Sequence, residues 1–424
     1  MIKPQHKNLV YNFSSLTLFQ ISNYIFPLIT FPYLVRVLGP EKYGLISFAA
    51  AFVLYFNIIT DYGFNITATK AISLNRDNKI KISEIISNIF MIKLGLFLLC
   101  TILFFLIVLS FSKFSNDLLI YVYSFYSLIG LVLLPNWVFQ GLEKMKFIAI
   151  INIAVKVFWV ISIFIFIKSE SDYLLLVLLN SFSIILISFI SLLVIYFLFK
   201  IKFVKPSYAE IKLLLFEGWY IFISTASISL YTNSNIFILG LFASNEIVGY
   251  FSAADKIRMA FQNITSSAGQ VIFPYLSNLF KNGFNSAVTF IKKYIASGSV
   301  LLFSLTVVMF ITAPWVIDIV LGPKYETSLP IFRILIFLPL IIFYSNALGI
   351  QIMINLGYNK EFTKVVLTAG IISIMLSFIF VPMYLEIGLA IIMLLVELIV
   401  SLGMLNFVLR KNILSIKKVE LNQK

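Results

Sequence analysis

Apolar runs about as long as a bilayer is thick recur along almost the whole chain. A helix needs roughly 20 apolar residues to cross about 30 Å of hydrocarbon. Of the 424 residues, 61% are hydrophobic and 12% are charged, with a mean hydropathy of +1.01, which is more apolar surface than a water-soluble core can bury. We therefore predict an all-α polytopic membrane protein with twelve transmembrane helices, at 13–35, 43–71, 83–109, 119–141, 148–167, 174–199, 213–241, 249–280, 294–313, 330–354, 363–383 and 387–409.

The formal net charge of +14 comes from basic residues that gather on one side of the predicted membrane. Most Lys and Arg residues fall in the ends and connections that share a side with the N-terminus. The opposite side holds only Arg36, Lys42, Lys113, Lys168, Lys324 and Arg333. By the positive-inside rule, both termini are predicted to be cytoplasmic. The net positive charge thus mainly reflects the topology of the chain, and it would also attract anionic lipid. We predict that the chain associates with the lipid bilayer and does not bind nucleic acid.

A short pattern occurs once in each half of the sequence. The motif E-x-x-G-x-x-S-x-A stands at 41–49, after the first span, and again at 246–254, after the seventh. Because six spans separate the copies, the halves would share one orientation as parallel repeats. We predict two six-helix lobes with their flanking segments: an N-lobe (1–199), a cytoplasmic inter-lobe connection (200–212), a C-lobe (213–409) and a basic cytoplasmic tail (410–424).

Two equivalent helices from each predicted lobe, the first, second, seventh and eighth, carry polar side chains along one face. Residues three or four apart share a helix face. A charged side chain that faces lipid at mid-membrane costs about 2.5 to 3.5 kcal/mol, so the charged members should be paired or face water. We predict that these polar residues, together with Lys93 of the third helix, line a polar, partly cationic central cavity. The predicted lining is Gln20, Asn23, Asn57, Asp61, Asn65, Lys70, Lys93, Asp255, Lys256, Arg258, Asn263 and Gln270.

Structural roles also fit some of these residues. Polar side chains often form hydrogen bonds between membrane helices, and Lys70 lies near the cytoplasmic end of its span, where its side chain can extend to the interface. Asp255 and Arg258, at i and i+3, can pair within their own helix. Lys256 has no acidic neighbour on its face. It is therefore the strongest candidate for meeting an anionic ligand.

Two further lysines, Lys93 and Lys156, lie within apolar spans. For each of these lysines, two roles are equally compatible with the sequence. The lysine can pair with Asp61 or serve another structural role inside the N-lobe, or it can contact a ligand directly.

No catalytic or metal-binding pattern occurs in the sequence. The single histidine, His6, precedes the first span, and the single cysteine, Cys100, lies in an apolar run, so no disulfide can form within the chain. There is no phosphate-binding glycine loop, nucleophile elbow or metal-ligand spacing. The predicted non-cytoplasmic connections are short. We therefore predict no catalytic residues, metal ions or cofactors, and we do not expect an enzyme.

Several motifs together resemble one family. They are PYL-x-R-x-LG-x-x-x-YG at 32–44, DYGFN at 61–65 and W-x-FQG-x-E at 137–143, with NEIVGYFSAADKIRMAFQNI and FPYLS in the second half. From about Asn8 to the last span, the chain is similar to the Wzx-type O-antigen flippases. These form part of the polysaccharide transporter branch of the multidrug/oligosaccharidyl-lipid/polysaccharide (MOP) exporter superfamily.

The resemblance implies a bilobed twelve-helix fold in the bacterial inner membrane. It implies that an undecaprenyl-pyrophosphate-linked oligosaccharide, such as an O-antigen repeat unit for lipopolysaccharide, moves from the cytoplasmic to the periplasmic leaflet by alternating access. Polymerase and chain-length proteins of the same pathway are the implied partners. The cationic cavity of the family is best matched here by Lys256 and Arg258, while Asp61 and Asp255 make its lining mixed.

Two other functions stay open at the level of the sequence. A multispan polysaccharide polymerase of the same pathway would be an enzyme, but such enzymes usually carry a large periplasmic loop that this chain lacks, and the internal repeat argues against one. A small-molecule antiporter of the same superfamily would share the fold. The sugars of the substrate and the coupling ion are not encoded in any motif of the chain.

Overall fold

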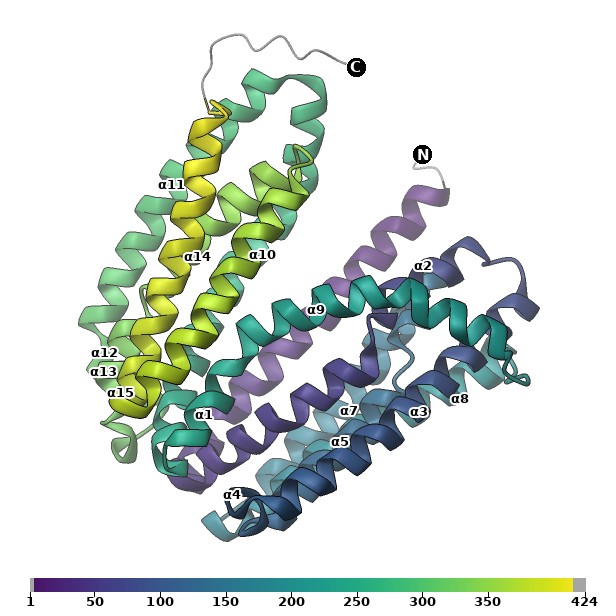
Figure 1. Ribbon diagram of the computed structural model, residues 1–424, viewed down its shortest axis with the longest axis horizontal. Coiled ribbons are helices and arrows are strands. Elements are labelled where there is room, and N and C mark those ends of the chain that lie inside the picture. The colour runs from purple at the N-terminus through teal and green to yellow at the C-terminus, as the bar shows by residue number, and fades with distance from the viewer. Residues whose placement is uncertain (1–3, 415–424) are drawn as a thin grey trace. The chain divides into compact units, whose positions relative to one another are not determined.

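The computed structural model describes residues 4–414, with side chains described from Gln20 onward except at positions 21, 24, 228, 230–232, 264, 265, 267 and 268. This part of the chain is almost entirely helical and contains no strand (Figure 1). The all-α prediction is therefore confirmed. Positions 415–424 of the predicted basic tail lie outside the described residues.

Eight described stretches are long and apolar enough to cross a membrane. Two of them, Ile25–Leu74 and Asn359–Arg410, run for 50 and 52 residues, more than twice the roughly 20 that one crossing needs. Each contains a residue with non-helical geometry, Gly39 with φ of 68° and Leu385 with φ of 45°. Each of these long stretches therefore overlaps two of the predicted spans, and the total of twelve stays a prediction.

The chain divides into two compact units, Met1–Ser229 and Leu230–Lys424. The sequence places the division between lobes at 200–212, whereas the division between these units falls inside α9. The relation of the two halves as repeats stays a prediction. The elements of the first unit are α1 (Pro4–Asp61), α2 (Phe64–Leu74), α3 (Lys79–Ser110), α4 (Ser112–Ser115), α5 (Leu118–Leu133), α6 (Asn136–Gly141), α7 (Met145–Phe166), η1 (Glu170–Asp172), α8 (Tyr173–Leu193), η2 (Val194–Leu198) and the beginning of α9 (Tyr208–Phe242).

Aromatic side chains fill the core of the first unit between α1, α3 and α5. Phe52 and Phe56 of α1 pack on Phe104 of α3, with ring centroids 5.9 Å apart in both cases. Phe104 in turn stacks on Phe125 of α5 at 4.2 Å. All four rings are buried, and large aromatic side chains contribute strongly to packing. This cluster fixes α1 against α3 and so positions the end of α1, where Asp61 lies.

The predicted connection at 200–212 lies against α3. The Ser207 amide donates to Asn88 Oδ1 at 2.8 Å, and Asn88 Nδ2 donates to Glu210 Oε2 at 2.6 Å. Glu210 also forms an ion pair with Lys81. These contacts anchor the start of α9 to the first unit, which explains why the division between units falls within α9 and not in the connection.

The second unit contains the rest of α9 and all later helices. The Ser328 hydroxyl donates to the Tyr250 carbonyl at 2.9 Å, and Tyr325 packs edge-on against the Tyr250 ring, with centroids 6.0 Å apart. Together they tie the beginning of α13 to α10. The elements are α10 (Asn245–Asn282), α11 (Phe284–Ile311), α12 (Ala313–Val320), η3 (Pro323–Tyr325), α13 (Ser328–Leu335), α14 (Leu338–Ser345), η4 (Asn346–Ile354) and α15 (Asn359–Arg410).

Candidate functional site

The predicted second span, 43–71, is not one continuous helix. α1 ends at Asp61 and α2 begins at Phe64, and between them Tyr62 and Gly63 have φ values of 48° and 77°. Glycine adopts this left-handed geometry readily, and other residues adopt it rarely. The prediction of an unbroken helix over 43–71 is therefore wrong at this point, and the DYGFN motif marks a break within the membrane-spanning segment.

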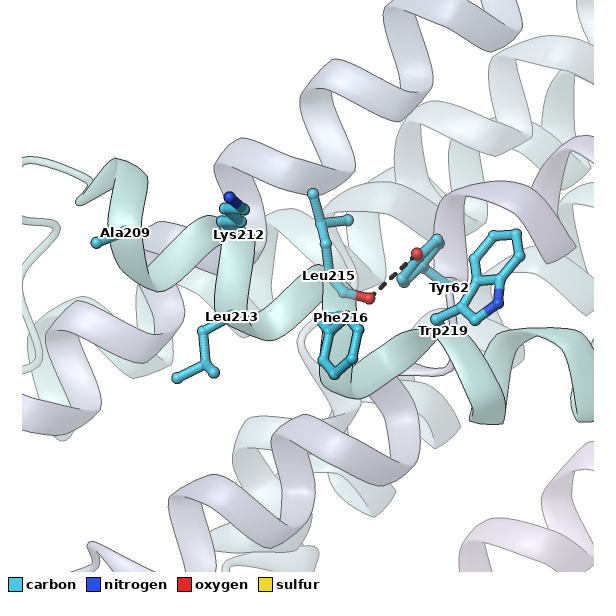
Figure 2. Close-up of a pocket in the computed structure, with 7 residues that line it drawn as sticks. All are labelled: Tyr62, Ala209, Lys212, Leu213, Leu215, Phe216 and Trp219. Atoms are coloured by element: carbon cyan, nitrogen blue, oxygen red, sulfur yellow. Dashed lines mark hydrogen bonds between the residues drawn. The ribbon is translucent and has the colours of Figure 1, made fainter.

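Tyr62 joins this break to the start of α9. Its hydroxyl donates to the Leu215 carbonyl at 3.2 Å, and its ring stacks on Phe222 with centroids 4.8 Å apart. Figure 2 shows Tyr62 beside Leu215 and Trp219. These residues line a groove of about 560 Å³. The rest of the groove lining comes from α9 and is apolar except for Lys212. The break is thus held by contacts from a helix more than 140 positions later in the chain.

Replacing Gly63 with valine should destabilise the first unit. A Cβ atom at this position would lie 2.7 Å from Ile221 Cγ2 of α9, and a β-branched residue is also strained at positive φ. We expect the free energy of unfolding to fall by about 1 to 3 kcal/mol, measured by thermal or denaturant unfolding of the purified protein in detergent. Gly95→Val is the control, because a Cβ atom at Gly95 meets nothing within 4 Å. Equal losses in both variants would contradict the prediction.

Asp61 and Asn65 stay side by side across the break. Asn65 Nδ2 donates to Asp61 Oδ1 at 2.7 Å, and Asp61 is half-buried, as is Asn57 one turn earlier on α1. The charge of Asp61 acts on Lys93 of α3, which is buried and donates to the Leu131 carbonyl at 3.3 Å. Lys93 is therefore held inside the first unit. Of the two roles that the sequence left open for it, this position favours the structural role over direct contact with a ligand.

The other predicted residues of the first unit lie in different surroundings. The Asn23 side-chain oxygen accepts a hydrogen bond from Lys156 of α7, so Lys156 pairs with Asn23 and not with Asp61. Gln20 and Lys70 are exposed. Lys70 lies near the end of α2, as expected for a side chain that extends to the membrane interface.

The W-x-FQG-x-E segment contains most of α6 and packs against α2. Trp137 is fully buried, and a Cβ atom on Gly141 would lie 2.7 Å from the Ile72 side chain, so the two helices pack closely. Arg76 donates from Nε to the Gly141 carbonyl at 2.8 Å and pairs with Glu143 at 2.6 Å. These contacts give Trp137, Gly141 and Glu143 of the motif a structural role.

In the second unit, Asp255 and Arg258 form a buried ion pair on α10. Arg258 Nη2 lies 2.6 Å from Asp255 Oδ1, and Arg258 Nε donates to the same oxygen at 2.8 Å. Each side chain is 7% exposed. The pairing at i and i+3 that the sequence allowed is therefore present. Each charge compensates the other, which permits both to be buried in this helix.

Lys256 differs from these two neighbours because it is exposed. One residue along a helix turns the side chain by about 100°, so Lys256 points away from the face that buries Asp255 and Arg258. Among the described residues, none forms a hydrogen bond or an ion pair with its amino group. Asn263 and Gln270 follow at steps of seven on the same helix face and are half-buried and exposed, respectively.

A pocket of about 200 Å³ lies inside the second unit beside Arg258. Glu397 of α15 lines it but is absent from the predicted site, although a lone carboxylate within an apolar span is a known signal of function. The other lining residues come from α9, α10, α14 and α15, so the grouping depends on the fold. The polar residues around this pocket are Asn233, Asn235, Arg258, Ser373 and Glu397.

The predicted cavity residues divide between the two units, and a single cavity lined by all of them stays a prediction. Within the described part of the chain, no group of three or more His, Cys, Asp or Glu residues is placed to hold a metal ion. The first unit contains Gln20, Asn23, Asn57, Asp61, Asn65, Lys70 and Lys93, and the second contains Asp255, Lys256, Arg258, Asn263 and Gln270.

Residues 9–280 match the family described as polysaccharide biosynthesis protein, and this is more than half of the chain. This chain belongs to that family. A relative from Escherichia coli (strain K12), described as an O-antigen transporter, is 33% identical over 409 residues, which cover 96% of this chain and 97% of the relative. A relative from Shigella dysenteriae with the same description is 30% identical and covers 91% and 96%. The resemblance drawn from the motifs, and the transporter class, are therefore confirmed.

Solved structures share the fold at low sequence identity. The lipid II flippase MurJ, in an inward closed conformation, has a TM-score of 0.68 and 15% identity, over 94% of this chain and 90% of that chain. A MATE family transporter of the MOP superfamily, in an inward-facing conformation, has a TM-score of 0.63 and 16% identity, over 95% and 96%. The polysaccharide biosynthesis family member described here is thus a multi-pass membrane protein with the fold of MOP superfamily transporters.

Proposed function

We propose that this protein is a flippase that moves an undecaprenyl-pyrophosphate-linked oligosaccharide from the cytoplasmic to the periplasmic leaflet of the bacterial inner membrane. The family and the two relatives described as O-antigen transporters support a polysaccharide repeat unit as the cargo. The fold that it shares with a lipid II flippase supports a cargo attached to lipid. The basic residues on the N-terminal side support cytoplasmic termini.

Within the candidate site, the amino group of Lys256, which is exposed and unpaired among the described residues, is the observation that supports this proposal most directly. A cation that faces lipid would cost about 2.5 to 3.5 kcal/mol, and no described residue of α10 forms an ion pair or hydrogen bond with Lys256. Arg258, two positions later, is neutralised by Asp255. Lys256 is therefore free to meet an anion that comes from outside the unit, and a lipid pyrophosphate supplies one.

Asp61 and Asn65 suit a different part of the same cargo. The half-buried Asp61 carboxylate has further acceptor positions beyond the hydrogen bond from Asn65. Sugar hydroxyls are donors that such a carboxylate can accept. In this proposal Lys256 of the second unit binds the phosphate, and Asp61 of the first unit binds sugars of the head group. Alternating access of these two units is the proposed mechanism, with polymerase and chain-length proteins of the pathway as partners.

The two rival functions give different products. A polysaccharide polymerase would lengthen lipid-linked chains in membranes that contain this protein and no other protein of the pathway. A small-molecule antiporter would move a soluble compound, with no change in the distribution of lipid-linked sugars between leaflets. The relatives described as transporters weigh against the first, and their O-antigen cargo weighs against the second.

Deletion of the gene should trap lipid-linked repeat units on the cytoplasmic leaflet. In cells without a second flippase, an impermeant lectin applied to spheroplasts should label far fewer repeat units than in the parent strain, while total lipid-linked oligosaccharide rises. Expression of the full-length protein from a plasmid should restore labelling. Normal labelling in the deletion strain would sink the proposal, and identification of the accumulated lipid by mass spectrometry would define its sugars.

A further inference from the structure

A second groove, of about 470 Å³, lies between α11, α13 and α15 of the second unit. Its walls are apolar and include Phe310, Ile334 and Leu394, and its only charged lining residue is Arg333 of α13. Ile311 and Trp315, which follow at the end of α11 and in α12, are 61% and 62% exposed. Exposed apolar residues next to an apolar groove indicate a surface that faces lipid.

Arg333 in this groove lacks the partner that other arginines have. Its guanidinium lies over the Phe310 ring, 5.3 Å from the centroid, and its Nε is buried without a hydrogen-bond acceptor. Among the described residues, no carboxylate lies within ion-pair distance of it. Arg76 and Arg258, in contrast, are each paired with a carboxylate at 2.6 Å. Arg333 is thus a half-buried cation with unused donors.

A guanidinium presents five N–H donors in a planar fork that binds phosphate oxygens in pairs. An unsatisfied N–H in an apolar setting is costly, so an anion that accepts it would bind favourably. The groove lies at the end of α11, where this helix meets the short α12. The ends of membrane-spanning helices lie near the lipid head groups, and Trp315 is a residue type enriched there. On the charge pattern of the sequence, this is the non-cytoplasmic end.

We infer that this groove binds an anionic phospholipid, with Arg333 on its phosphodiester and the apolar walls against an acyl chain. A single cation with no second basic residue in the lining matches the single charge of a phosphodiester better than the higher charge of a pyrophosphate. The site is therefore assigned to a resident lipid and not to the transported cargo. It is independent of the proposed flippase activity.

The test measures lipid retention by the purified full-length protein with native mass spectrometry. Delipidated protein in detergent is titrated with phosphatidylglycerol or with phosphatidylcholine of the same acyl chains. We expect at least one phosphatidylglycerol to be retained more tightly than phosphatidylcholine. Arg333→Gln should weaken that phosphatidylglycerol retention about ten-fold or more, as expected for the loss of a charge-assisted hydrogen bond. Lys324→Gln, which removes an exposed cation of the preceding loop, should leave it unchanged.

A second variant keeps the test decisive if Arg333→Gln fails to fold. Ile334→Trp fills the groove and keeps the arginine, so it should also abolish retention of phosphatidylglycerol. Equal retention of the two lipids by the native protein would overturn the inference, as would full retention by both groove variants or an equal loss in Lys324→Gln. Displacement of phosphatidylglycerol by equimolar polyprenyl pyrophosphate would also overturn it, by assigning the groove to the cargo.

Discussion

Arg258→Ala is expected to lower the stability of the second unit by about 3 to 5 kcal/mol, because it leaves the buried Asp255 carboxylate without its counter-charge. Both side chains are 7% exposed and joined by contacts of 2.6 and 2.8 Å. Removal of one member of such a pair costs more than removal of both, since the remaining charge stays desolvated. The measurement is thermal unfolding of the purified protein in detergent.

A double variant separates this explanation from a simple loss of packing. Asp255→Leu combined with Arg258→Met replaces the pair with apolar side chains, and it should recover most of the lost stability, because such replacements of buried ion pairs are often neutral. Lys256→Ala, on the exposed face of the same helix, should melt like the native protein. A double variant as unstable as Arg258→Ala would show that the pair itself contributes to stability and that an isolated Asp255 charge is not the cause.

Lys256→Ala is expected to remove most of the transport activity without affecting folding. If Lys256 binds an anionic group of the cargo, loss of that charge-assisted contact, worth about 1.5 to 3 kcal/mol, should reduce transport roughly 10- to 150-fold. The spheroplast labelling described above, with membrane levels of the protein matched by immunoblot, gives the measurement. Lys256→Arg keeps the charge and should retain a substantial part of the activity.

Two outcomes would contradict this role. Native labelling by Lys256→Ala would remove Lys256 from the site. Loss of activity together with a lower melting temperature would assign it to the structure of α10, and the exposed, unpartnered amino group described here argues against that result. Asp61→Asn gives a parallel comparison in the other unit, because it preserves the shape of the side chain and the neighbourhood of Asn65 while it removes the charge.

Local patterns predicted some contacts of individual side chains, while the cavity that these side chains are proposed to line stays a prediction. The i, i+3 spacing of Asp255 and Arg258 anticipated their ion pair, and the lack of an acidic neighbour singled out Lys256. The polar residues of DYGFN marked the segment as unusual. The sequence did not reveal that the helix breaks there, because Gly63 within an apolar helix is compatible with either geometry until α9 packs on it.

Contacts between distant segments could not be predicted in the same way. Lys156 pairs with Asn23, 133 residues away, and Lys93 reaches a backbone carbonyl of α5. Glu397 was given no role from the sequence, and Arg333 served only in the count of basic residues on each side of the membrane. Only the helices packed around them define a pocket at Glu397 and a groove at Arg333. In each case the decisive neighbour lies on a helix that the spacing of residues does not identify.

The sequence by itself determined that the chain is a helical membrane protein of the polysaccharide biosynthesis family. These properties follow from runs of apolar residues, from the side on which basic residues gather and from short motifs, all of which are local. Only the tertiary structure decided which groups Lys93 and Lys156 meet, and that Arg333 retains unused hydrogen-bond donors. The physical reason is that the free energy of a charge in a membrane depends on the groups packed around it, and packing brings those groups together from different helices.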